Sequence, residues 1–178
     1  NNGVNGYELW KSDGTEGGTT MVKDIYTGST PSSPSNLTIL GTTLYFSATN
    51  GANGTELWKS DGTAGGTTIV KDIYVGTGNG AANYLTVMGN YIYFYGSNGT
   101  NGTELWKSDG TDAGTVMVKD IVVGAAGSGP SNLLAVENTL YFRANNGTNG
   151  TELWKSDGTE GGTTMIKDIN VGSSSSSP

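Results

Sequence analysis

Acidic and basic side chains are the groups in this sequence that could do chemistry, and nearly all of them recur at a fixed spacing. Twelve of the 16 acids occupy three positions of a 48-residue repeat, and eight of the nine basic residues occupy two more. Glu137 and Arg143 are the singular ones. General acid–base catalysis needs two groups that are tuned differently within one cleft. A repeat of identical charges offers almost no such asymmetry, so we expect the chain not to be an enzyme.

Composition excludes several other functions. The chain has no cysteine and no histidine, which removes disulfides, thiolate nucleophiles, Ser-His-Asp triads and the usual zinc or copper ligands. A net charge of −7 argues against nucleic acid, whose phosphates require a basic face, and against anionic membranes. No apolar run approaches the roughly 20 residues that span a bilayer. We therefore expect no nucleic-acid partner and no membrane insertion.

Four tryptophans mark the repeat that must position these charges. They lie 48 residues apart without insertion or deletion, each inside the octapeptide Glu-Leu-Trp-Lys-Ser-Asp-Gly-Thr. A fixed period of this length is typical of propellers, solenoids and other repeat arrays. We expect the tryptophans to pack between neighbouring repeats. They are Trp10, Trp58, Trp106 and Trp154.

Each repeat contains four short β-like runs separated by turns, and nothing in it predicts a helix. Gly41-Thr42 and Asn53-Gly54 are tight-turn signals. Four strands in 48 residues match one blade of a β-propeller. The predicted fold class is all-β, a β-propeller-type array of four-stranded antiparallel blades, with a β-solenoid as the alternative. In the second repeat the predicted strands are Asn36–Leu40, Thr43–Ala48, Thr55–Ser60 and Thr67–Ile73.

The repeat register predicts one array over residues 1–178, made of a half blade and three complete blades. The half blade supplies only the third and fourth strands. Such an array leaves apolar faces exposed at both ends, and another copy or the rest of a longer polypeptide would have to cover them. The predicted parts are residues 1–30 for the half blade, 31–78, 79–126, and 127–178 including a C-terminal linker.

The octapeptide resembles the repeat of the bacterial ELWxxDGT-repeat family. Residues 8–15 and their three later copies match the motif, and the flanking Gly18-Thr19 and Lys23-Asp24-Ile25 are also typical. The resemblance covers essentially the whole chain and departs from the pattern at Tyr7, where the other copies have Thr. It implies a secreted or surface protein with β-propeller-like repeats, and no particular activity. The expected localisation is extracellular or cell surface.

The loop Ser-Asp-Gly-Thr-x-x-Gly-Thr that follows each tryptophan is similar to the Asp boxes of sialidase-type propellers. An aspartate there can accept N–H groups of a tight loop while Gly takes a positive φ, and we favour this structural role. Calcium is the alternative, but it requires six to eight oxygen ligands and usually several carboxylates. We predict no metal and no other cofactor. The turn aspartates are Asp13, Asp61, Asp109 and Asp157.

Positions that vary between repeats are the better candidates for ligand specificity. Ser47, Tyr95 and Arg143 share one repeat position in the second strand of each blade, and they could line a shared binding surface. By contrast, the neighbouring lysines and aspartates, such as Lys23 and Asp24, are interpreted as surface charges of little energetic weight.

Two functional hypotheses follow. The first is a non-enzymatic extracellular module with a structural or self-assembly role, whose blades stack within and between chains into a ring or fibre. The alternative is a multivalent, lectin-like propeller that binds glycans through repeated aromatic and polar groups. An enzyme of the sialidase or lyase kind is a third reading, which a single arginine disfavours.

Overall fold

Strands form wherever β-branched and aromatic residues alternate between glycine-rich turns. The computed structural model describes residues 1–80, 82–176 and 178, and every regular element among these residues is a β-strand. The turn between the first two strands of a complete repeat begins with Gly41 or Gly89, whose φ angles of 62° and 60° favour glycine. Its third copy begins with Glu137, which has a φ of 52°. No helix in the described residues is long and apolar enough to cross a membrane.

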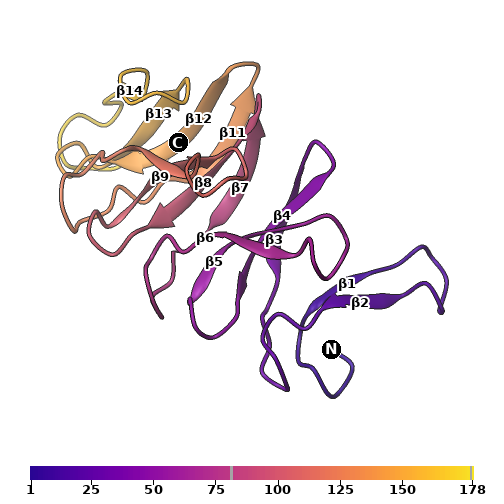
Figure 1. The fold of residues 1–178 in the computed structure, drawn as a ribbon. Coiled ribbons are helices and arrows are strands. Elements are labelled where there is room, and N and C mark those ends of the chain that lie inside the picture. The colour runs from indigo at the N-terminus through magenta and orange to yellow at the C-terminus, as the bar shows by residue number, and fades with distance from the viewer. Residues whose placement is uncertain (81, 177) are drawn as a thin grey trace. The chain divides into compact units, whose positions relative to one another are not determined.

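The chain divides into two compact units, residues 1–82 and 83–178, which are described separately. Unit 1 holds a two-stranded sheet, sheet 1, and a four-stranded sheet, sheet 2, in which each strand pairs antiparallel with the next along the chain (Figure 1). Sheet 1 consists of β1 (Leu9–Lys11) and β2 (Thr20–Lys23), and sheet 2 of β3 (Ser35–Leu40), β4 (Thr43–Thr49), β5 (Thr55–Ser60) and β6 (Thr68–Lys71).

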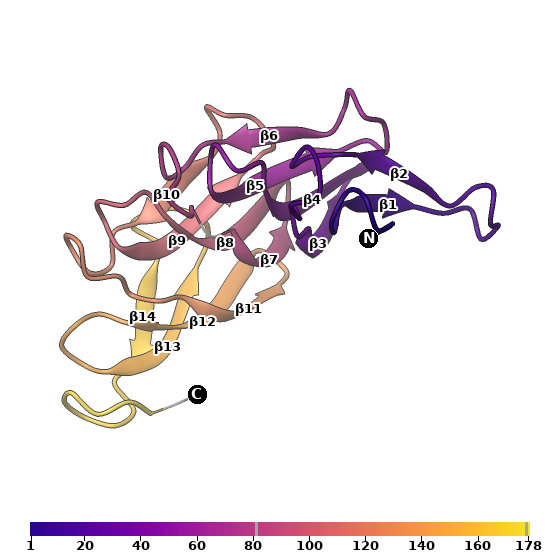
Figure 2. The same cartoon turned by 90° about the horizontal axis from the view of Figure 1, so that it is seen from below.

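Unit 2 holds two complete sheets of the same antiparallel topology, each with its strands side by side in chain order. The view in Figure 2 shows this order for β11 to β14. Sheet 3 consists of β7 (Asn83–Met88), β8 (Tyr91–Ser97), β9 (Thr103–Ser108) and β10 (Val116–Lys119), and sheet 4 of β11 (Ser131–Val136), β12 (Thr139–Asn145), β13 (Thr151–Ser156) and β14 (Thr164–Lys167).

One cross-strand pair recurs in each complete sheet. The tryptophan of the third strand lies opposite a phenylalanine of the second strand. These phenylalanines are 0%, 0% and 1% exposed, and aromatic cross-strand pairs of this kind stabilise sheets. The pairs are Phe46 with Trp58, Phe94 with Trp106, and Phe142 with Trp154.

Each unit has a core in which two sheets pack together. In unit 1, Leu9, Val22 and Ile25 of sheet 1 and the segment after it pack with Phe46 and Trp58 of sheet 2. The core of unit 2 repeats this arrangement. Leucine, valine and isoleucine of sheet 3 pack against the aromatic pair of sheet 4; the residues are Leu105, Val118, Ile121, Phe142 and Trp154.

The all-β class and the repeated four-stranded antiparallel sheets predicted from the sequence are confirmed. The strand bounds agree to within one residue except at the fourth strand, which ends at Lys71 rather than at the expected Ile73. The physical reason is that the N–H of Ile73 donates to the Glu56 carboxylate, at 3.0 Å. That donor is therefore taken out of the strand ladder.

Candidate functional site

Each unit contains one junction between neighbouring sheets, sheets 1 and 2 in unit 1 and sheets 3 and 4 in unit 2. The lysine of the octapeptide in one sheet reaches across each junction to a backbone carbonyl of the next sheet. Lys11 Nζ donates to the carbonyl oxygen of Gly62 at 2.9 Å, and Lys107 Nζ donates to that of Gly158 at 2.8 Å. Hydrogen bonds from charged donors are stronger than those between neutral groups, so these lysines tie neighbouring sheets together.

A second lysine of each repeat makes a similar bond. Lys23 Nζ donates to the carbonyl oxygen of Thr67 at 2.7 Å, and Lys119 Nζ donates to that of Thr163 at 2.8 Å. The interpretation of Lys23 and Asp24 as surface charges was wrong for these lysines, which are half-buried. Asp24 has other partners, since its Oδ2 accepts from the Asn5 side chain at 2.9 Å.

The glutamate of each octapeptide is a buried acceptor that the sequence analysis missed. Glu56 is fully buried and accepts from the backbone N–H groups of Ile73, Tyr74 and Gly80, at 3.0, 3.3 and 2.8 Å. It thereby binds the loop that leaves its own sheet. One signal was available, because strand alternation places Glu56 on the same face as Trp58. The equivalent glutamates, Glu8, Glu104 and Glu152, also accept backbone N–H groups of the following loop.

Burial raises the pKa of two of these glutamates. It raises the pKa of Glu56 to about 7, against hydrogen bonds from Ile73, Gly80 and Tyr74 that lower it. Burial likewise raises the pKa of Glu104, against hydrogen bonds from Ser128. In both cases the low-dielectric surroundings disfavour the charged carboxylate. The bonds to these glutamates are structural, because their acceptor oxygens point to backbone N–H groups rather than into a cleft.

The turn aspartates form the loops that receive the lysines. Asp61 Oδ1 accepts from the backbone N–H of Thr63 at 2.8 Å and from its hydroxyl at 2.7 Å, and these bonds lower the pKa of Asp61. Gly62 has a φ of 86°, and its carbonyl oxygen accepts from Lys11. The loop therefore holds the acceptor of the junction bond in place. Asp13, Asp109 and Asp157 bind the threonine two residues later in the same way.

No group of three or more metal-ligating side chains occurs in the described part of the chain. One Asp61 oxygen already accepts two hydrogen bonds within its own loop, and a Cβ added at Gly66 would collide with the Asp61 carboxyl group. The aspartate is thus packed against its own loop backbone.

The tryptophans differ in exposure. Trp58, Trp106 and Trp154 are 5%, 6% and 6% exposed, whereas Trp10 is 36% exposed. Trp58 and Trp154 belong to the cores in which a preceding sheet packs against them. In the described residues no sheet precedes sheet 1, which leaves Trp10 accessible.

The three variable positions have unequal surroundings. Ser47 is buried, at 1% exposure, and its hydroxyl donates to the carbonyl oxygen of Ala82. Tyr95 is half-buried, with its ring edge-on to Tyr84 at 6.2 Å between centroids. Arg143 is also half-buried, with a buried Nε that has no hydrogen-bond partner. The structure therefore gives each of them a different environment on its own sheet.

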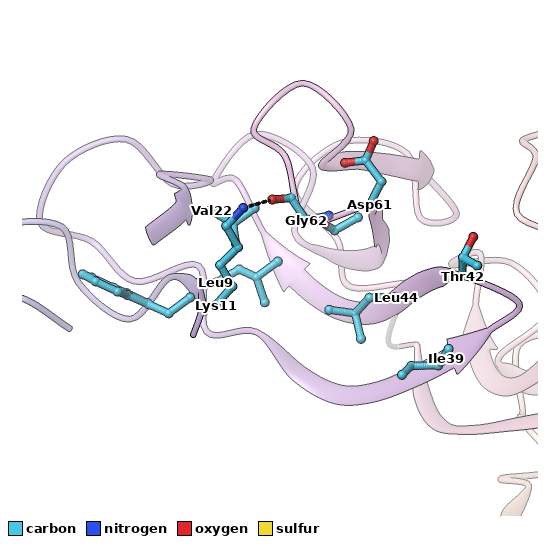
Figure 3. Close-up of a pocket in the computed structure, with 10 residues that line it drawn as sticks. Leu9, Lys11, Val22, Ile39, Thr42, Leu44, Asp61 and Gly62 are labelled. Atoms are coloured by element: carbon cyan, nitrogen blue, oxygen red, sulfur yellow. Dashed lines mark hydrogen bonds between the residues drawn. The ribbon is translucent and has the colours of Figure 1, made fainter. Parts of the chain in front are cut away.

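A cavity of about 170 Å³ opens at the junction of unit 1. Figure 3 shows Leu9 and Val22 of sheet 1 and Leu44 and Ile39 of sheet 2 around it, with Lys11 bonded to Gly62 at its rim. Trp10 adds to this apolar lining, and Thr42, Ser60 and Asp61 are the other polar residues around the cavity. Such a surface suits apolar packing better than the binding of a charged ligand.

Comparisons with known proteins assign no function to the chain. No protein-family model matches the chain, and no curated protein matches it. Among solved structures, the chain is similar to the crystal structure of the computationally designed Ika8 protein, with 15% sequence identity and a TM-score of 0.42. The match covers 83% of this chain and 39% of that chain, so the chain spans about two fifths of the designed protein.

Proposed function

We propose that this chain is a non-enzymatic, extracellular repeat module of β-propeller type that assembles with further copies of itself by stacking sheets. Two surfaces support this proposal, an offering face on sheet 4 and a receiving face on sheet 1. The offering face of a sheet is the set of side chains that packs onto the next sheet. In sheet 4 it consists of Leu153, Lys155, Ile166, Lys167 and Ile169.

The offering face of sheet 4 carries the proposal. The equivalent apolar residues of sheet 1 are buried at the junction of unit 1, where Leu9 is 5%, Val22 7% and Ile25 6% exposed. In sheet 4 the corresponding Ile166 and Ile169 are 44% and 53% exposed. Side chains that are buried in one copy of a repeat and exposed in another mark an interaction surface.

The receiving face of sheet 1 consists of Trp10 and the carbonyl oxygens of Gly14 and Thr19. In the junctions, the matching threonines Thr67 and Thr163 are fully buried and accept from lysine. Thr19, in contrast, is exposed. Stacking sheet 4 of one copy onto sheet 1 of another would bring lysine donors to carbonyl acceptors and isoleucines to Trp10. A contact between two different faces is heterologous, and it gives a ring if the rotation closes or a fibre if it does not.

Sedimentation equilibrium over a range of concentrations tests the proposal. We expect the mass to rise above that of the 18.3 kDa chain, and the double variant Ile166→Asp, Ile169→Asp to remain monomeric because charge is placed on the offering face. The control Val123→Asp changes a valine that is 88% exposed and should assemble normally. A wild-type chain that stays monomeric at millimolar concentration would remove the proposal.

Carbohydrate binding is the alternative, and one surface favours it. A cavity of about 240 Å³ on sheet 4 is lined by Asn132, Tyr141 and Arg143, among others, and the buried Arg143 Nε is an unpaired donor. An aromatic ring beside amide and guanidinium donors suits a sugar. A glycan array together with sedimentation separates the two functions. If the chain both assembles and binds sugar, Arg143→Ala should abolish sugar binding on the array but leave the mass of the assembly unchanged.

A further inference from the structure

The cavity in unit 1 lies where unit 2 has an additional pair of strands. In unit 2, β8 pairs with β9, the strand that carries the octapeptide. Tyr93 lies opposite Lys107, and Phe94 lies opposite Trp106. β1 is the equivalent of β9, and it pairs only with β2 among the described residues. The other edge of β1 therefore presents unpaired backbone groups, which can accept an added strand.

The hairpin formed by β7 and β8 also covers the first strand of sheet 4. Thr86 Oγ1 donates to the carbonyl oxygen of Leu133 at 3.3 Å, and Met88 and Tyr93 lie in the core of unit 2. Leu133 and Ala135 of β11 pack against that core and are half-buried.

The equivalent strand of unit 1 is uncovered. Leu37 and Ile39 of β3 stand where β11 has Leu133 and Ala135, and they are 57% and 67% exposed. Ile39 lines the cavity together with Leu9, Val22 and Leu44, and Leu37 lies two residues before it on the same face of β3. We call these five residues and the edge of β1 the unit 1 groove.

We propose that the unit 1 groove is a docking site for a β-hairpin of this repeat's first-two-strand type, donated by another polypeptide that carries the same repeat. The hairpin adds a strand to β1, with its tyrosine opposite Lys11 and its phenylalanine opposite Trp10. Its first strand covers Leu37 and Ile39. The occupant follows from unit 2, where a hairpin of this type occupies the equivalent groove against the same kinds of side chain.

This inference depends only on unit 1 and holds even if assembly through sheet 4 fails. The residue types of the occupant are set by the register. The docking strand needs an aromatic pair at the positions of Tyr141 and Phe142, and residues 131–145 provide a soluble example because they also carry Glu137 and Arg143. Backbone pairing supplies affinity, and the aromatic pair supplies specificity.

Hydrogen exchange of the full chain with a synthetic peptide of residues 131–145 tests docking. We expect the amides of residues 9–11 and 37–39 to exchange at least tenfold more slowly with the peptide, and Trp10 fluorescence to shift to shorter wavelength. A control peptide with Tyr141→Asp and Phe142→Asp should give no protection. The chain variant Ile39→Asp, changed at an exposed position, should fold normally and weaken binding at least tenfold.

A fusion provides the second measurement, because it holds the hairpin beside β1 at a high effective concentration. Residues 1–6 occupy the same place in the repeat as residues 49–54, so a copy of residues 35–48 can be joined directly before Asn1. The fusion should protect residues 9–11 and 37–39 and raise the melting temperature of unit 1 by about 5 °C or more. The same fusion with Tyr45→Asp and Phe46→Asp in the added copy should not.

The outcomes are distinct. Protection by the peptide supports docking of a separate hairpin. Protection by the fusion alone, with none by the peptide at millimolar concentration, overturns donation by another polypeptide and assigns the groove to a covalently connected hairpin. Protection by neither overturns the groove as a strand-binding site. Equal protection by the aspartate-substituted peptide overturns the proposed register.

Discussion

The junctions of units 1 and 2 share their polar bonds and differ in their apolar cover. The two lysine bonds agree to within 0.1 Å between them, at 2.9 and 2.8 Å for Lys11 and Lys107 and at 2.7 and 2.8 Å for Lys23 and Lys119. On the first strand of the receiving sheet, however, Leu37 and Ile39 of unit 1 are exposed, whereas their equivalents in unit 2, Leu133 and Ala135, are half-buried. Local loop geometry therefore suffices for the polar bonds, whereas apolar burial depends on a complete neighbouring sheet.

The largest effect should distinguish a tryptophan that is covered from one that is not. Trp58→Ala and Trp154→Ala should each lower the free energy of unfolding of their unit by about 3–5 kcal/mol, because both leave a cavity in a core. Trp10→Ala should cost about 1–2 kcal/mol, since the side chain is already 36% exposed. Urea unfolding followed by hydrogen exchange assigns each loss to its unit. An equal cost at Trp10 would show that the receiving face is covered in solution.

The glutamate acceptors should behave alike whether or not their sheet is complete. Glu56→Ala leaves two buried N–H donors and one half-buried donor without their acceptor and should cost about 3 kcal/mol. Glu8→Ala should cost a similar amount, because Glu8 accepts from Ile25 and Ser32 at 2.8 and 2.9 Å although sheet 1 has only two strands. A much smaller loss for Glu8 would show that these bonds depend on the additional pair of strands that the four-stranded sheets have. Chemical denaturation of both variants provides the measurement.

The pH dependence of unit 1 should follow Glu56. Its pKa is about 7 in the folded chain against an ordinary value near 4.5, so between these values the folded chain retains a proton that the unfolded chain has lost. This contribution is fully present below about pH 4.5 and disappears as pH rises through 7, with a loss of about 1–2 kcal/mol after solvent screening. Thermal melts of wild type and Glu56→Gln from pH 4 to 8 measure it. The variant should lack this part of the slope, and an unchanged slope would contradict the assignment.

The lysine bonds should be equivalent in the two junctions. Lys11→Met and Lys107→Met keep the aliphatic stem and remove the donor, and each should cost about 0.5–1 kcal/mol, the usual net contribution of one hydrogen bond. Differential scanning calorimetry of both variants makes the comparison. A loss at Lys107 several times that at Lys11 would mean that the hairpin of unit 2 strengthens the polar bond as well.

The smallest effect concerns one turn. Glu137 has a φ of 52° where Gly41 has one of 62°, and a side chain at such an angle is strained. Glu137→Gly should therefore stabilise unit 2 by about 0.5–1 kcal/mol, and Gly41→Glu should destabilise unit 1 by a similar amount. Thermal unfolding of this reciprocal pair measures both. A loss of stability in Glu137→Gly would show that the glutamate makes a compensating contact.

Much of the fold could be predicted because it is local and repeated. Alternating apolar residues and turn glycines predict β4 and β5 to within one residue, and the hydrogen bonds of Asp61 lie within its own loop. The bonds of Glu56 and Lys11 could not be predicted in this way. Their acceptors and donors lie 17 or more residues away along the chain, and residue type alone does not reveal whether a charged side chain is buried.

The sequence by itself determined the period, the strand order and the turn chemistry, since these depend on neighbours within a few residues. The tertiary structure decided which copies of a repeated side chain are buried. Trp10 and Trp58 stand in the same octapeptide, yet one is accessible and the other lies in a core. Burial depends on what packs against a face rather than on the residues that form it, and only the assembled sheets provide that neighbour.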